Sequence, residues 1–121
     1  MAGTSEQPAA DYIFKWAREQ GFEAIMEEVA PGRSNVIVTW SVGAGDRKSM
    51  FEGHTDVVTP GDEVAWQYDP FGAEIVGRLM YGRGTNDTKG NLAAMLIAMA
   101  ALKRSGIKLS GTIIGGVLCD E

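Results

Sequence analysis

Hydrophobic and polar positions along the chain follow two different periods. In two segments apolar residues recur every three to four positions, as in helices, whereas β-branched and alternating runs elsewhere are typical of strands. The pattern predicts helices over residues 8–19 and 91–104, and strands over residues 22–29, 35–40, 49–54, 73–76, 78–81 and 111–118. The order strand, loop, helix, strand indicates a crossover connection. We therefore expect an α/β fold with a mixed, mostly parallel sheet and flanking helices.

Both predicted helices carry signals at their ends. Ser5 is placed to cap the first helix, and Gly21 is placed to end it. The second helix is apolar nearly all round over residues 92–102 and is followed by Gly106, which suits its C-terminus. A helix that is apolar on most sides needs cover on more than one side. We expect the sheet beneath this helix and other structure above it.

Composition and charge narrow the class of protein. At 121 residues the chain is one domain or part of one, and its net charge of −5 gives no support to nucleic-acid binding. The longest apolar run, residues 92–102, is shorter than the roughly 20 residues that span a bilayer. The N-terminus lacks the features of a secretory signal, and the single cysteine, Cys119, excludes an internal disulfide. These features favour a cytoplasmic protein with neither a nucleic-acid nor a membrane partner.

Side chains suited to metal chemistry follow three of the predicted elements. His54, the only histidine, ends a strand, and Asp56 lies two positions later, so both side chains project to the same side. Asp87 lies in a glycine-bounded loop, and Asp120 and Glu121 follow the last strand. Because ligands gather at the carboxyl ends of strands in α/β sheets, we expect these loops to meet. An imidazole with several carboxylates suits Zn²⁺, Co²⁺ or Mn²⁺.

Other interpretations of the same residues stay open at this point. A lone histidine is more often a core or surface residue than a ligand, Asp87 suits a helix N-cap, and a terminal acidic pair suits solvent. The glycine spacing over residues 82–90 matches neither a dinucleotide-binding nor a Walker A loop. Cys119 lies beside the acidic pair but in an apolar strand, so a buried, inert thiol is favoured over a cysteine nucleophile.

A series of short motifs resembles the M20 metallopeptidases, from about Asp11 to the last residue. The motifs are Gly53-His54-Thr55-Asp56-Val57-Val58, Gly61-Asp62, Trp66, Asp69-Pro70-Phe71, Tyr81-Gly82-Arg83-Gly84, Asp87-x-Lys89-Gly90 and Asp120-Glu121. They occur in the family's order and with fitting gaps. The family includes acetylornithine deacetylase, succinyl-diaminopimelate desuccinylase, aminoacylase, carboxypeptidase G2 and related dipeptidases. The resemblance implies a zinc-peptidase catalytic fold of the phosphorylase/hydrolase-like type.

The resemblance also implies roles for four residues. His54 resembles a histidine ligand to one metal ion, and Asp56 resembles the carboxylate that orients it. Asp87 resembles the aspartate that bridges two zinc ions, followed in the family by a cis peptide bond. Glu121 resembles the general base that takes a proton from the metal-bound water. The implied activity is hydrolysis of an amide bond in an N-acyl amino acid or small peptide. The resemblance implies two zinc ions per complete site, with cobalt or manganese as alternatives. It also implies a homodimer as one form of the complete protein.

Further family features are missing from the sequence. The family has a second glutamate directly after the general base, another acidic ligand and a second histidine downstream, and a lid or dimerisation domain between two halves of its catalytic domain. We expect residues 1–121 to be the N-terminal portion of an M20-type catalytic domain, with the lid and C-terminal half absent. We also expect this chain alone to be inactive and to bind zinc weakly. The alternative is a truncated, non-catalytic binding or assembly module derived from the same fold.

Overall fold

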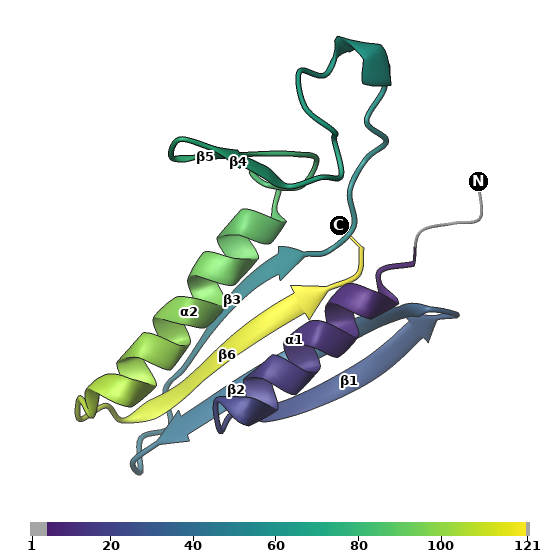
Figure 1. Cartoon of the computed structure of the whole chain (residues 1–121). Helices are drawn as coiled ribbons and strands as arrows, with labels where there is room; N and C mark the ends of the chain where they lie inside the picture. The colour runs from purple at the N-terminus through teal and green to yellow at the C-terminus, as the bar shows by residue number, and fades with distance from the viewer. Residues whose placement is uncertain (1–4, 121) are drawn as a thin grey trace.

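A computed structural model describes residues 5–120, which form a mixed sheet with two helices packed against it (Figure 1). The elements, in order, are α1 (Gln7–Glu19), β1 (Glu23–Ala30), β2 (Arg33–Val42), β3 (Lys48–His54), the 3-10 turn η1 (Glu63–Ala65), β4 (Glu74–Val76), β5 (Leu79–Tyr81), α2 (Lys89–Ser105) and β6 (Gly111–Leu118). Every predicted helix and strand is present within a few residues of its expected bounds. The predicted α/β fold with flanking helices is confirmed.

The main sheet has the strand order β1-β2-β6-β3. Its β3–β6 pair is parallel, whereas β1–β2 and β2–β6 are antiparallel, so the expectation of a mostly parallel sheet is wrong for these strands. The reason is the length of the connections. The turn at residues 31–32 folds β2 back along β1, and antiparallel strands can be joined by such short turns. Only the long connection through β4, β5 and α2 makes a parallel crossover, which inserts β6 between β2 and β3.

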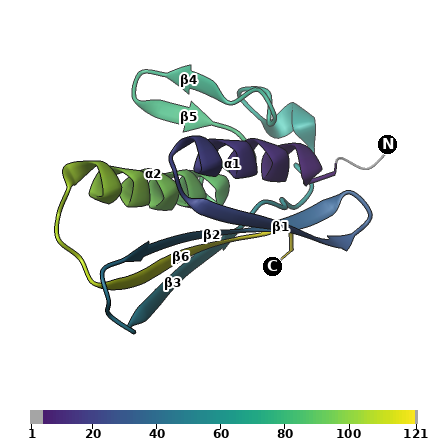
Figure 2. The same ribbon diagram turned by 90° about the horizontal axis from the view of Figure 1, so that it is seen from below.

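Both helices cover the same face of the sheet, as Figure 2 shows. Alternate residues of β2 face them, because side chains along a strand point to opposite faces. The buried apolar core is made by Ala10, Ala17, Phe22, Ala24, Val36, Val38, Leu92, Leu96, Met99, Ala100 and Val117. On α2 only one stripe is buried, and Ile97 remains 58% exposed. Within residues 5–120, α2 therefore lacks the second cover that its apolar composition predicted.

The start of α1 differs in detail from the prediction. The N-cap position is Glu6, whose side chain makes no capping hydrogen bond, so Ser5 is not the N-cap. The Ser5 hydroxyl instead accepts a hydrogen bond from the Gln7 amide at 3.0 Å and donates one to the Gly32 carbonyl. Ser5 thus ties the start of α1 to the β1–β2 turn. At the other end Gly21 follows the last turn with φ +78°, a conformation that glycine adopts readily.

The parallel β3 and β6 end at the same edge of the sheet, and the antiparallel β2 begins there. The loop after β3, the β4–β5 hairpin and the start of α2 gather beyond this edge (Figure 1). The topology therefore brings the segments that follow β3, β5 and β6 to one place. This is where the sequence predicted a functional site.

Gly90, the second residue of α2, lets this helix start close to the preceding loop. A Cβ at this position would lie 2.1 Å from the Thr85 carbonyl oxygen, which is a backbone atom and cannot swing away. Gly90→Ala should therefore displace the loop and lower the free energy of unfolding by about 1–3 kcal/mol. Urea unfolding measures the change. A loss smaller than about 0.5 kcal/mol, the scale of ordinary surface substitutions, would contradict this tight approach.

Candidate metal centre

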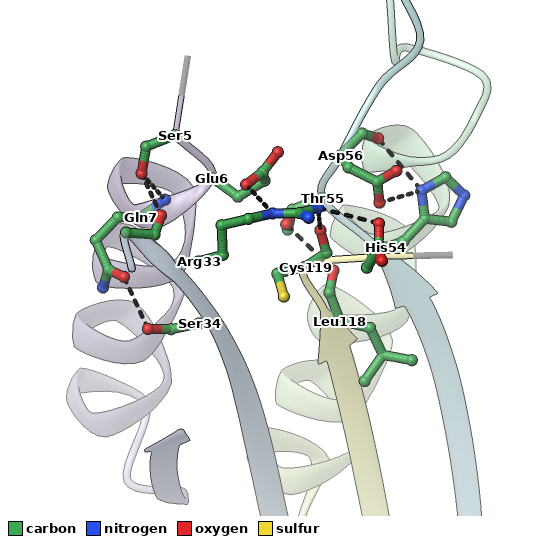
Figure 3. Close-up of polar contacts among 12 residues, drawn as sticks. Ser5, Glu6, Gln7, Arg33, Ser34, His54, Thr55, Asp56, Leu118 and Cys119 are labelled. Carbon is green, nitrogen blue, oxygen red and sulfur yellow. Dashed lines mark hydrogen bonds and ion pairs between the residues drawn. The ribbon is translucent and has the colours of Figure 1, made fainter. Parts of the chain in front are cut away.

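His54 is the last residue of β3, and its side chain is only 15% exposed. Its Nδ1 lies 3.1 Å from the Asp56 carboxylate Oδ1 and 3.2 Å from the Asp56 carbonyl oxygen (Figure 3). The prediction that both side chains project to the same side is confirmed. Two oxygens on one nitrogen favour the tautomer in which Nδ1 carries the proton. Such an arrangement fixes the ring and leaves Nε2 as the ligand atom.

The second ring nitrogen of His54 faces the loop before α2. Its Nε2 lies 3.3 Å from Oδ1 of Asp87, whose side chain is 79% exposed. The peptide bond between Asp87 and Thr88 is cis, as the family resemblance implied. The loop is held by hydrogen bonds from the Lys89 amide to the Gly84 carbonyl, at 2.9 Å, and from the Asn91 side chain to the Asn86 carbonyl, at 3.2 Å. These contacts place the Asp87 carboxylate over the end of β3.

The separation between His54 and Asp87 suits a shared cation. With the proton on Nδ1, the lone pair of Nε2 faces a carboxylate oxygen, an arrangement that favours a cation between the two atoms. Two ligands of a tetrahedral zinc ion with bonds of about 2.0–2.2 Å lie about 3.3–3.6 Å apart. The Nε2–Oδ1 distance is 3.3 Å. These two residues therefore fit a zinc ion as a pair of ligands.

The third predicted loop also reaches this edge. One hollow of about 320 Å³ lies at this edge and is lined by Glu52, Gly53, His54, Thr88, Leu118 and Asp120. The carboxylate of Asp120 contacts Arg33, at 3.0 Å from Oδ1 to Nη2. Glu121, the predicted general base, lies outside the described residues. Within residues 5–120, no group of three histidine, cysteine, aspartate or glutamate side chains is arranged to hold a metal ion.

Three polar residues to which the sequence pattern assigns no role hold the end of β6. They are Arg33 and Asn35 from β2, and Thr55 after β3. Thr55 belongs to the motif around His54, but nothing local marks Arg33 or Asn35. Beside them the Cys119 thiol is free and 1% exposed, so the prediction of a buried cysteine is confirmed. Among the helices of residues 5–120, none is long and apolar enough to cross a membrane.

Residues 50–121 match the family of M20/M25/M40 peptidases, and the chain belongs to this family. Among its relatives, the succinyl-diaminopimelate desuccinylase of Methylocella silvestris is 39% identical over 117 residues, which are 93% of this chain and 30% of that protein. The succinyl-diaminopimelate desuccinylase 1 of a Ruegeria species is 55% identical over 64 residues, 53% of this chain and 17% of that protein. The chain thus spans less than a third of these relatives.

Solved structures agree on the fold. The M20 family metallo-carboxypeptidase Sso-CP2 from Sulfolobus solfataricus superposes with a TM-score of 0.82 at 26% identity, over 94% of this chain and 26% of that one. Human carnosine dipeptidase 1 superposes with a TM-score of 0.76 at 19% identity, over 93% of this chain and 26% of that one. The second likeness concerns the fold alone. The α/β architecture is therefore that of M20 peptidase domains.

Proposed function

We propose that this chain forms the N-terminal part of the catalytic domain of a metal-dependent amide hydrolase. The observation that carries the proposal is the arrangement of His54, held by Asp56 on Nδ1 and facing Asp87 with Nε2 at 3.3 Å. Membership in the M20/M25/M40 peptidases supports the same class. The site lies at the carboxyl ends of β3 and β6, where α/β folds bind their ligands.

The proposed substrate is an N-acyl amino acid or a small peptide. Both sequence relatives are named for the removal of a succinyl group from diaminopimelate, and Sso-CP2 is described as a carboxypeptidase. These names share one reaction type, hydrolysis of an amide bond next to an amino acid. The open rim of the site, with Asp87 at 79% exposure, leaves room for such a substrate to approach.

Each proposed residue has one task. His54 and Asp87 would hold zinc, or cobalt or manganese, and Asp56 orients the His54 ring. A zinc ion held there would supply Lewis-acid chemistry: it would polarise the scissile carbonyl and lower the pKa of water to about 7. Glu121 takes a proton from the attacking water and passes it to the leaving nitrogen, which completes the change from amide and water to carboxylic acid and amine.

Chelator-sensitive hydrolysis tests the proposal. The protein, purified from its source at its natural length, is assayed with N-succinyl and N-acetyl amino acids and with dipeptides. We expect amide hydrolysis that a chelator abolishes and zinc restores. Hydrolysis that persists in chelator contradicts a metal-dependent mechanism, and absence of hydrolysis of every substrate contradicts the enzyme class. The intact mass of the same preparation tests the domain proposal, which predicts a mass well above 13.0 kDa.

A non-catalytic binding or assembly module is the second candidate. The observation that favours it is an apolar hollow of about 340 Å³ between the two helices, lined in part by Tyr12, Trp16 and Ile97. Zinc titration of the 121-residue chain separates the candidates. Stoichiometric binding that disappears in His54→Ala favours a metal site, although we expect it to be weak because His54 and Asp87 are the only proposed ligands. Absence of binding in every oligomeric state favours the module.

Asp56→Ala should weaken zinc binding without removing a ligand. Loss of a carboxylate that orients a metal-bound histidine costs about 10–100-fold in metal affinity. The Asp56 carbonyl oxygen also faces Nδ1, at 3.2 Å, and stays in place, so we expect a loss near the lower end of this range. Competition with a chelator measures the affinity. Asp46→Ala, an exposed aspartate in the β2–β3 loop, is the matched control. Equal affinity in the two variants would contradict the orienting role.

A further inference from the structure

Arg33, at the start of β2, joins three segments of the chain (Figure 3). Its Nε donates a hydrogen bond to the Glu6 carboxylate at 2.8 Å, just before α1. Its Nη2 donates to the Cys119 carbonyl at 2.6 Å and to the Asp120 carboxylate at 3.0 Å. The Glu6 side chain is only 16% exposed, so this part of the contact is shielded from water. One guanidinium therefore links α1 and β2 to the residues after β6.

The segment after β6 is held at successive backbone groups. The Leu118 carbonyl accepts hydrogen bonds from the Thr55 amide, at 2.7 Å, and from the Thr55 hydroxyl, at 3.1 Å. The Cys119 amide donates to the Asn35 side chain at 2.9 Å. Arg33 supplies the next bond, to the Cys119 carbonyl, and also donates to the Asp120 side chain. Because the bonds from Thr55 and Asn35 reach only as far as the Cys119 amide, removing Arg33 frees the part closest to position 121.

An arginine suits this position for a geometric reason. Its planar fork presents donors in fixed directions and binds a carboxylate on one side while reaching a carbonyl on another. Glu6 and then Asp120, by hydrogen bonding, raise the pKa of Arg33 above its usual range, so the group stays charged. A lysine has one compact ammonium group and cannot reproduce the fork. The contacts at Glu6, Cys119 and Asp120 therefore need the guanidinium itself.

We propose that Arg33 is a positioning residue that fixes the backbone of residues 119–120, the segment that leads to the proposed general base. The catalytic part of this inference rests on the proposed function of Glu121. The structural part, that Arg33 fixes Cys119 and Asp120, does not depend on it. The side-chain and backbone groups that Arg33 contacts, on Glu6, Cys119 and Asp120, are not proposed metal ligands. Loss of Arg33 should therefore lower kcat and leave KM little changed.

The reactivity of Cys119 shows how firmly Arg33 fixes residues 119–120, without any assay of activity. It is the only cysteine and is 1% exposed, so its reaction with a thiol reagent measures local opening of this segment. Because hydrogen bonds to charged groups are strong, Arg33→Ala should speed this reaction about 10-fold or more. Arg33→Lys keeps the charge and the aliphatic stem, so it serves if the alanine variant does not fold, and it should also react faster. Arg104→Ala, an exposed arginine near the end of α2, is the matched control.

Catalysis is measured in the protein at its natural length with the same substitutions. A misplacement of about 1 Å in a catalytic group costs about 10²-fold in rate, so kcat should fall by this order in Arg33→Ala. Added guanidinium ion should restore part of kcat in Arg33→Ala, whereas equal concentrations of urea should not. A loss of stability alone would show neither the rescue nor an unchanged KM.

The two assays separate the possible failures. If Cys119 reacts no faster in Arg33→Ala than in Arg104→Ala, Arg33 does not fix residues 119–120, whatever the protein catalyses. Faster Cys119 reaction with unchanged kcat in a chelator-sensitive enzyme would overturn the positioning role. Absence of hydrolysis in the unsubstituted protein would contradict the proposed function and with it the catalytic part of this inference, while the Cys119 assay still decides whether Arg33 fixes residues 119–120.

Discussion

His54→Ala is expected to lower the zinc content and the activity of the protein together. The side chain supplies the Nε2 that faces Asp87 at 3.3 Å, and none of the neighbours along β3 can replace an imidazole there, since His54 is the only histidine in the sequence. Changing a residue that only orients a metal ligand costs about 10–100-fold, so removing the ligand itself should cost more. Zinc content by atomic emission and hydrolysis of N-acyl amino acids measure the two losses on one preparation.

A control and a companion variant sharpen this prediction. Asp87→Asn removes the charge of the second proposed ligand and keeps its shape, so it should also lower zinc content. Asp46→Asn makes the same chemical change in an exposed loop at the opposite end of β3 and should change neither quantity. Full zinc content in His54→Ala would contradict the proposed metal centre, even if activity were lost.

Glu121→Gln is expected to leave zinc in place and to reduce kcat sharply. Glutamine has nearly the same shape as glutamate but cannot accept the proton of the attacking water. General base catalysis contributes about 10²–10⁴-fold to rate, and a loss in this range is expected. KM should change little, because the substitution removes a proton acceptor and no proposed substrate contact. Steady-state kinetics with matched zinc analysis checks both statements.

The contrast between the two variants is the informative result. His54→Ala should lose metal and activity, whereas Glu121→Gln should lose activity alone. If Glu121→Gln kept more than about a tenth of the parent kcat, a general base of the usual effect would have to lie elsewhere. If it lost zinc in parallel with activity, position 121 would act as a ligand. Either result would reassign the roles at the end of β6.

Local patterns explain why most of the fold followed from the sequence. The predicted strand over residues 111–118 has the same bounds as β6, because glycine begins it and an apolar, β-branched run fills it. The contact between His54 and Asp56 could also be predicted from the sequence, since a period of two at a strand end is a local property. Asp87 depended on the motif that surrounds it, because a single aspartate before a helix is as typical of a cap.

The role of Arg33 did not follow from the sequence. Its bond to the Cys119 carbonyl spans 86 positions. The bond exists because β2 runs antiparallel to β6, which places the start of β2 beside the end of β6. The expectation of a mostly parallel sheet would have put these two ends at opposite edges. Neither hydrophobic periodicity nor turn residues specify which strand is inserted between two others, so contacts of this kind depend on the tertiary structure.

The most direct test of the metal centre is anomalous diffraction at the zinc edge from crystals of the protein at its natural length. We predict an anomalous peak about 2.0–2.2 Å from both His54 Nε2 and an Asp87 carboxylate oxygen. We also expect Asp56 still to contact His54 Nδ1. A zinc-loaded crystal with no peak beside His54, or with its peak on residues other than His54 and Asp87, would contradict the proposed metal centre.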